Sequence, residues 1–494
     1  MKKIAKFLIV LGMMGQLSSC DYLDIVPDER AQESDTWKTE GAVRGYLYSC
    51  YGYLPANRTF GNSYWLAEEL TAVTKELFTT FKYGYYSPVS LGFTSNTWST
   101  IWNGIHQCYM FQESLKQVSN EYVTDEMKKQ YLAESNFLIA YYHFLSMRSY
   151  GPTMIIRSVI DLETPISGFP ERSSIDEVVA FINEKLDEAM SEGGLPTTWS
   201  GKDYGRATRL AALALKSRVY LYAASPLYNG NTEMYADFRS PLDGRQLIAQ
   251  EKSQAKWEIS ATQTKYAIDE VEKAKFHLYH DADAGEPSDA KPGLPNKAQR
   301  RLRYTNIDNQ TGNNPEIIWA DTRNDDYYGI QRRCPPRQTL GGKFAGISMT
   351  NCPTLQTIEA FYTKNGLPIN KDKTFDYDER YEYISAPENC DGNNYEDLVK
   401  YANFTPSSDK VMRLCTDREP RFYAWTTYHN GYFEFGKYNN EEISADPAKR
   451  AIRIHLLRDD PHGRGNRTDQ EYSISGFGNK KGVVPSAEWN VIEY

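Results

Sequence analysis

The sequence has no long apolar run: none of its 494 residues belongs to the ~20-residue uninterrupted apolar stretch that a membrane-spanning helix needs. Positive charge is also in short supply, with 56 Lys and Arg against 65 Asp and Glu and a formal net charge of −9. An acidic chain repels phosphate, which argues against a nucleic-acid partner. Disorder is a poor description, because 37 Tyr, 20 Phe and 9 Trp are more aromatics than a solvated chain carries.

Catalytic and cofactor motifs are missing as well. The sequence contains no HExxH, GxxxxGK[ST], GxSxG or CxxC pattern. His277 and His280 are more typical of a helix end than of a metal site, and Asp281-x-Asp283-x-Gly285 has the wrong register for an EF-hand. We therefore expect no catalytic residue, no metal and no cofactor. Paired carboxylates for glycoside hydrolysis stay open, since 65 acidic residues are present.

The N-terminus indicates export. Three lysines precede the short apolar run FLIVLGMM at 7–14, which is the pattern of a secretory signal. The following LSSC at 17–20 resembles the lipobox of a bacterial lipoprotein. We expect residues 1–19 to be a signal peptide and Cys20 to be lipidated, which would anchor the protein to a membrane through several acyl chains.

The other six cysteines fit an exported chain, in which disulfides persist. The local pairs Cys334 with Cys352 and Cys390 with Cys415 are the first disulfides to test, and other pairings stay open. Cys50 and Cys108 lie in helical patterns and are predicted to be buried thiols.

Helical periodicity dominates up to about residue 280. The capping box Ser174-x-x-Glu177 begins one helix, and Gly151-Pro152 ends another. The segment 206–224 is apolar nearly all round and is expected to be central, with its end at Pro226. Predicted helices cover 41–53, 98–118, 130–150, 175–190, 206–224 and 256–278.

The fold class predicted is mainly α, a solenoid of tetratricopeptide-like helical pairs, although a strict 34-residue period is absent. Beyond 281 the chain is rich in Gly, Pro and Asn, with strand candidates at 316–320, 422–428 and 452–457. We expect this loop-rich part, about 281–494, to pack as insertions onto the helical part, about 30–280. Residues 20–494 would then form a single composite domain.

Several segments together resemble the SusD/RagB family of outer-membrane nutrient-binding lipoproteins of Bacteroidota. Three carry most of the likeness: CDYLDIVP at 20–27, AESNFLIAYYHFLSMRSYGP at 133–152 and GRATRLAALALKSRVYLYAASP at 205–226. Softer matches follow in family order at 314–319, 353–366 and 417–422. The family continues with C-terminal helices that complete a fourth helical pair, so we expect this sequence, ending at Tyr494, to be a fragment.

The resemblance implies capture rather than chemistry. Such proteins bind oligosaccharides, or peptides in some members, at the cell surface of the outer membrane and pass them to a TonB-dependent outer-membrane transporter. A glycan site needs exposed aromatic rings beside polar side chains that bind hydroxyl groups. Candidate ligand-binding residues of this kind are Trp65, Tyr83, Tyr85, Asn96, Trp98, Asp321, Arg323, Asn324, Tyr327 and Tyr328.

The run 321–328 is the favoured candidate, because it puts Arg and Asn beside two tyrosines in a predicted loop. Trp98 is better explained as core, since Trp98, Trp102 and Ile105 have helical spacing. Oligosaccharide capture is the leading hypothesis and peptide capture the second. A surface glycosidase would show two carboxyls about 5 to 10 Å apart in a cleft, and a purely structural scaffold would show no exposed aromatic patch.

Overall fold

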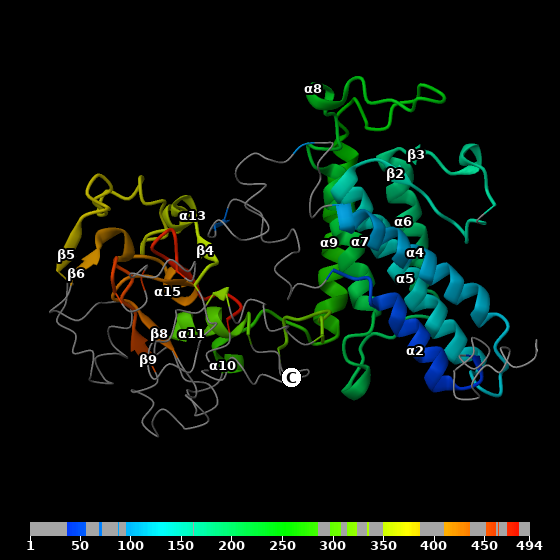
Figure 1. Cartoon of the computed structure of the whole chain (residues 1–494), viewed down its shortest axis with the longest axis horizontal. Helices are drawn as coiled ribbons and strands as arrows, with labels where there is room; N and C mark the ends of the chain where they lie inside the picture. Colours follow the sequence, from blue (N-terminus) through cyan, green and yellow to red (C-terminus); the bar gives the residue numbers. More distant parts are fainter. Residues whose placement is uncertain are drawn as a thin grey trace, which may run out of the picture.

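The structure is a computed structural model, which describes residues 37–55, 69–71, 87, 95–161, 163–284, 297–307, 314–323, 333–334, 349–385, 410–434, 451–460, 463 and 472–483. Figure 1 shows two parts side by side, an array of long helices and a loop-rich part with short helices and strands. That the chain divides near residue 281, and that the two parts form one composite domain, stays a prediction.

Among the described residues, six long helices build the helical part, and each packs against the next one along the chain. Their bounds are α2 Glu40–Tyr51, α4 Ser95–Leu115, α5 Asp125–Tyr150, α6 Ile175–Ala189, α7 Arg209–Ala224 and α9 Gln254–Lys273. All six lie where helical periodicity predicts a helix, within a few residues at each end. Successive helices packed as neighbours are the arrangement expected for stacked helical pairs.

Local sequence signals set where these helices begin and end. Thr124 caps α5 by accepting a hydrogen bond from the backbone N–H of Met127, and Thr208 caps α7 in the same way. The predicted capping box at Ser174 and Glu177 begins α6. Helix α5 ends at Gly151, whose φ of 71° is a conformation that favours glycine.

Helix α5 lies at the centre of the helical part and contacts α2, α4, α6 and α7. It is buried on most of its circumference, including Phe137, Tyr142 and Phe144. Helix α7 packs against α5, α6 and α9, but it leaves one stripe open, on which Arg218 and Leu221 are exposed. The apolar character of 206–224 therefore identified a buried helix but not the most central one.

Short elements and loops make up the rest of the chain. The short helices are α8 Thr232–Tyr235, α10 Asp281–Ala284, α11 Lys297–Tyr304, α13 Leu355–Ala360 and α15 Pro420–Trp425. The strands form two-stranded antiparallel pairs: β1 Leu70–Thr71 with β4 Cys352–Pro353, β2 Thr153–Met154 with β3 Arg172–Ser173, β5 Tyr383–Ser385 with β6 Lys410–Met412, β7 Thr426–Thr427 with β10 Gly478–Asn479, and β8 Tyr432–Glu434 with β9 Ala451–Arg453.

The loop-rich part has its own small core around Phe422, packed with Ile358 and Leu414. Arg418 is 3% exposed and lies beside this core. Its guanidinium donates hydrogen bonds to the carbonyls of Leu414, Ile358, Phe361 and Tyr362 at 2.6 to 3.3 Å. One side chain thus satisfies backbone acceptors of two separate segments, 358–362 at the end of α13 and Leu414, because the end of a short helix leaves carbonyls without an intrahelical partner.

Of the three predicted strands, one is wrong and two are found only in part. Residues 316–320 are irregular, because no strand of the described residues pairs with them and Trp319 is held by other contacts, described below. Residues 422–428 begin inside helix α15, which starts at Pro420, a residue suited to the first helical position, and only Thr426–Thr427 of this candidate form a strand, β7. Strand β9 overlaps the first two residues of the third candidate at 452–457.

The cysteine predictions have a mixed outcome. Cys50 and Cys108 are buried thiols on α2 and α4, as expected. Cys334 and Cys352 are both free, so the disulfide predicted between them is not formed in the structure. Each sulfur has its own partner: Cys334 accepts from the Asn479 amide, and the Cys352 thiol donates to the carbonyl of Thr71. Cys415 is also a buried free thiol, and Cys390 lies outside the described residues.

The described helices are also informative about membranes. None of them is both long enough and apolar enough to cross a bilayer. The two candidates for membrane attachment, the signal peptide at 1–19 and Cys20, lie outside the described residues.

Candidate functional site

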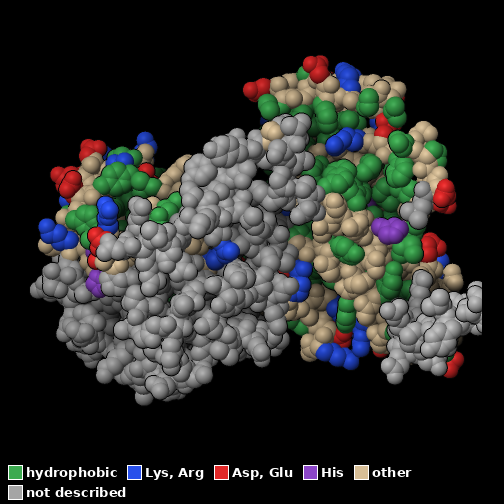
Figure 2. All heavy atoms as spheres, in the orientation of Figure 1, with side chains coloured by type: hydrophobic (Ala, Val, Ile, Leu, Met, Phe, Trp, Pro, Cys, Tyr) green, Lys and Arg blue, Asp and Glu red, His purple; other side chains and the backbone are tan. Residues whose placement is uncertain are grey.

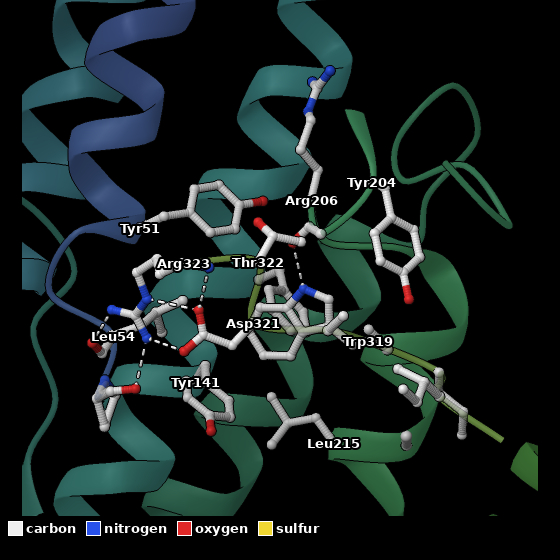
Figure 3. A pocket seen from close by; sticks show the side chains of 18 of the residues that line it. Tyr51, Leu54, Tyr141, Tyr204, Arg206, Leu215, Trp319, Asp321, Thr322 and Arg323 are labelled. Carbon is white, nitrogen blue, oxygen red and sulfur yellow. Dashed lines mark hydrogen bonds and ion pairs between the residues drawn. The ribbon is translucent and has the colours of Figure 1, made fainter. Parts of the chain in front are cut away.

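A cleft of about 910 Å³ opens between α2, α5, α7 and the segment 314–323. Figure 3 shows residues of these elements converging on it, with Trp319 drawn above Tyr141 and Leu215. The segment 314–323 follows the helical part in sequence yet forms one wall of the cleft. The site therefore lies where the loop-rich chain returns to the helices.

Two helices form the floor of the cleft. On α5 the lining residues Phe137, Tyr141 and Arg148 are spaced by four and seven residues, so they lie on one face. On α7 the lining residues include Ala211 and Arg218, also seven apart. Both faces are apolar along most of their length and end in an arginine.

Trp319 forms the centre of the cleft wall. Its indole N–H donates a 2.8 Å hydrogen bond to the carbonyl of Gly205. The ring meets Phe137 and Tyr141 edge-on, at centroid distances of 5.1 and 5.5 Å. Edge-to-face packing is a preferred aromatic geometry. These contacts fix the wall segment against α5 and against the loop before α7.

A buried ion pair stabilises the start of α7 beside the cleft. Glu134 of α5 is fully buried, and Arg206 donates to both of its oxygens at 2.5 and 3.2 Å. Asp203 accepts a further bond from Arg206 at 2.8 Å. The Tyr51 hydroxyl donates to Glu134 at 2.6 Å and accepts from the backbone N–H of Ala207. Helices α2, α5 and the approach to α7 are thereby tied together.

The electrostatics of this pair follow from its contacts. Burial lowers the pKa of the Arg206 guanidinium, but its hydrogen bonds with Glu134 and the charge of that carboxylate outweigh burial and raise the pKa. The Trp199 ring also lies 4.0 Å from the guanidinium carbon. Arg206 therefore stays charged, and its role is structural, because its donors are engaged inside the protein.

Asp321 and Arg323 fasten the far end of the wall segment. The guanidinium donates to both Asp321 oxygens, at 2.6 and 2.7 Å, and to the carbonyls of Leu54 and Pro55, both at 2.8 Å. Hydrogen bonding to Asp321 raises the pKa of Arg323. Figure 3 shows this clamp on the opposite side of Trp319 from Tyr204.

Aromatic side chains remain available at the cleft. Tyr48 on α2 is 41% exposed and lines the opening. Tyr141, Tyr204 and Trp319 are partly exposed there as well. Partly exposed rings beside charged and backbone groups are the combination that binds a molecule with both an apolar face and hydroxyl groups.

The residues predicted from the sequence are only partly placed. Asp321 and Arg323 line the cleft. Trp98 does not; it packs edge-on against Trp102 and Tyr150, at 5.3 and 4.9 Å. Asn96 lies in the first turn of α4, and nothing is described of its side chain. Residues outside the described part of the chain are Trp65, Tyr83, Tyr85, Asn324, Tyr327 and Tyr328.

Sequence reasoning missed most of the cleft. Tyr48, Tyr204, Arg218 and Trp319 were not among its candidates. Trp319 could have been found only through its place in the family-like segment 314–319. Arg218 carried a weak signal, because it is a cation within the most apolar predicted helix, and charged side chains are rarely buried without a partner. Tyr48 carried none, because a tyrosine in a helix usually packs against another helix.

Metal binding finds no support in the part of the chain that the structure describes. No group of three or more His, Cys, Asp or Glu there could hold an ion. The His277 and His280 rings lie 5.1 Å apart, just after α9.

Two family models match the chain, one after the other. The model described as "Starch-binding associating with outer membrane" matches residues 21–221, and the model of the SusD family matches residues 315–491. The chain belongs to the SusD/RagB family. Members of this family are carbohydrate-binding, non-catalytic proteins associated with the outer membrane. Among curated proteins none matches the chain.

Solved structures of the same kind share the fold. The protein BT4246 is 27% identical, with a TM-score of 0.72 over 90% of this chain and 73% of that one. A SusD-like protein of Bacteroides fragilis is 20% identical, with a TM-score of 0.60 over 93% and 70% of the two chains. A second protein of that organism, described as a SusD-like carbohydrate binding protein, is 16% identical with a TM-score of 0.51 over 90% and 68%. The tetratricopeptide-like helical fold predicted from the sequence is confirmed.

Proposed function

We propose that this protein captures oligosaccharides in the cleft between α2, α5, α7 and the segment 314–323. In this proposal it is anchored to the outer membrane through Cys20, faces the cell surface and delivers its ligand to a partner TonB-dependent transporter. Family membership supports carbohydrate binding, and the lipobox-like LSSC at 17–20 supports the anchor. The transporter partner rests on the family resemblance.

The observation that carries the proposal is the set of partly exposed rings in the cleft. A sugar ring has an apolar C–H face and a rim of hydroxyls, so it binds to an aromatic face flanked by polar groups. Tyr48, Tyr204 and Trp319 supply the rings, and the cleft volume of about 910 Å³ is within the range of ligand sites. A purely structural scaffold would have no such patch of exposed aromatic rings.

The acidic residues of the cleft favour binding over hydrolysis. A glycosidase needs two carboxyls free to reach the scissile bond. Asp321 is engaged by Arg323, and Glu316 accepts a 2.8 Å hydrogen bond from the backbone N–H of Tyr279. Neighbouring Glu134 is fully buried beneath Arg206. Each of these three carboxylates therefore stabilises the protein itself.

Affinity electrophoresis and calorimetry test the proposal. The chain from residue 21 onward should be retarded in gels that contain a recognised polysaccharide, and it should leave the glycan chemically intact. Binding to peptides with no retardation by any glycan would replace the proposal with peptide capture. Cleavage of the glycan would replace it with hydrolysis.

The anchor and the partner have their own tests. Palmitate labelling of the full chain in a bacterial host should depend on Cys20, so Cys20→Ala should lose both the label and membrane association. Co-purification from outer membranes should recover a TonB-dependent transporter. A labelled Cys20→Ala variant, or purification of the protein alone, would overturn these parts separately.

A further inference from the structure

The cleft contains two exposed cations that form no ion pair with any acidic side chain of the described residues. Lys202 lies in the short turn before α7, and Arg218 lies on the open stripe of α7. Both side chains are exposed, and among the described residues no carboxylate forms an ion pair with either of them. Arg148, at the end of α5, lines the same cleft.

The acids that line the cleft or adjoin Lys202 in sequence are engaged elsewhere. Asp203 pairs with Arg206 at 2.8 Å, although it is next to Lys202 in sequence. Asp321 pairs with Arg323 at 2.6 Å, and Glu316 accepts from the Tyr279 backbone. The cleft thus has an excess of positive charge, in a chain whose formal net charge is −9.

Several cations on neighbouring surfaces are paired. Lys216 is on the same helix as Arg218, and it pairs with Asp187 of α6 at 2.5 Å. Lys185 pairs with Glu188, and Lys256 pairs with Asp176. Pairing is therefore common on the helical part, whereas the two cleft cations are left available.

Their positions bear on the size of the ligand. Lys202 precedes the first residue of α7, Arg209, and Arg218 lies nine residues into the helix, a rise of about 14 Å at ~1.5 Å per residue. We therefore expect the two charges to be too far apart to bind one sugar unit. They would bind separate units of a chain that lies along α7, with the rings of Trp319 and Tyr204 nearby.

We propose that the captured oligosaccharide is acidic, and that Lys202 and Arg218 bind carboxylate or sulfate groups carried on different sugar units. This inference rests on the proposed function, because it names the ligand class of the same cleft. A guanidinium forms paired hydrogen bonds with either anion, and an ammonium group acts as a point charge. Because both cations are exposed, salt should weaken the attraction.

The test is calorimetry of the full chain against three oligosaccharide sets. Oligogalacturonides represent uronic acids, chondroitin sulfate oligosaccharides represent sulfated sugars, and their carboxyl-reduced or desulfated forms provide neutral counterparts. We expect an acidic form to bind at least about tenfold more tightly than its neutral counterpart. That preference should shrink as sodium chloride rises from low to high concentration.

Three variants locate the charge. Arg218→Gln and Lys202→Gln should each weaken binding of the acidic form by about tenfold more than binding of the neutral form. Lys373→Gln is the matched control, since Lys373 is an exposed lysine of the loop-rich part with no ion pair among the described residues. It should change neither affinity. Circular dichroism should report folded protein for all three.

Each outcome is decisive. Equal affinity for acidic and neutral forms, or binding of neutral glycans alone, would overturn the acidic ligand and leave glycan capture standing. Acidic preference that survives both cleft variants would overturn the assignment to Lys202 and Arg218. No binding to any glycan would overturn the proposed function itself. A preference for carboxylate over sulfate forms, or the reverse, identifies the anion.

Discussion

The two parts of this molecule are held together differently, and their buried arginines show how. In the helical part Arg206 pairs with Glu134 and Asp203, and the backbone is satisfied within helices. In the loop-rich part the guanidinium of Arg418 donates to four backbone carbonyls, and no carboxylate of the described residues pairs with it. The arginine that joins long helices is neutralised by carboxylates, whereas the arginine of the loop-rich part satisfies carbonyls that short elements leave without a partner.

The pKa values of the two arginines shift in opposite directions. Burial lowers the pKa of Arg418, because carbonyl dipoles offset only part of the cost of burying its charge. Arg206 has its pKa raised by Glu134. The candidate site combines both kinds of contact. Its floor consists of helices, and on its wall segment Arg323 binds the Asp321 carboxylate as well as the backbone carbonyls of Leu54 and Pro55.

The largest expected effect is the loss of Arg206. Arg206→Met leaves Glu134 buried without a counter-ion, which costs about 3–5 kcal/mol of the free energy of unfolding. Urea denaturation should show this loss. The control is Arg157→Met, which removes a solvent-exposed ion pair with Glu184 and should cost about 0–1 kcal/mol. Similar losses in the two variants would mean that the buried pair does not tie α5 to α7.

Loss of Arg418 should have a smaller effect. Arg418→Met leaves backbone carbonyls without a hydrogen-bond donor in a small core, at a cost of about 1–3 kcal/mol of the free energy of unfolding. Part of this cost is offset, because the substitution also removes a buried charge that pairs with no carboxylate of the described residues. Hydrogen exchange should rise around 358–362 and 414–418 and stay unchanged in α5. Increased exchange in α5 would show that the two parts unfold together, and the contrast drawn here would fail.

Acid should weaken the helical part first. Burial lowers the pKa of His143 to about 4 from an ordinary 6.5, while its Nδ1–H donates to the Ile139 carbonyl and its Nε2 accepts from the Ile156 N–H. The unfolded chain therefore binds the proton first, and stability falls by about 1.4 kcal/mol per pH unit between these two values. His143→Gln should lose this slope in urea denaturation measured from pH 7 to 5.

The loop-rich part should respond only at lower pH. Hydrogen bonds from Thr363, Thr374 and Asn365 hold the pKa of Asp372 well below its ordinary 3.8. The stability that this carboxylate contributes is complete above pH 3.8 and is lost as pH falls through its lowered pKa. Exchange near 363–374 that increases between pH 6 and 5, ahead of α5, would reverse the predicted order.

Much of the helical part could be predicted from the sequence, because apolar spacing and capping residues act locally. The capping box at Ser174 and the stop at Gly151 are examples. The wall segment could not be predicted, since Trp319 is positioned by Gly205 and Phe137, more than a hundred residues earlier in the chain. Cleft residues such as Tyr48 and Arg218 come from separate helices, and only their packing brings them together. Of the run 321–328, Asp321 and Arg323 line the cleft, where they bind each other, and ligand binding by this run stays a prediction.

The most direct test of glycan capture in this cleft is the affinity of a Tyr48→Ala variant for the glycan that the wild-type protein binds. Tyr48 is exposed at the opening, so removal of its ring should leave the fold intact and weaken binding by about tenfold or more. Tyr122→Ala, which removes an exposed tyrosine outside the cleft lining, is the matched control and should bind normally. Unchanged affinity in Tyr48→Ala, measured by calorimetry beside the control, would contradict the account.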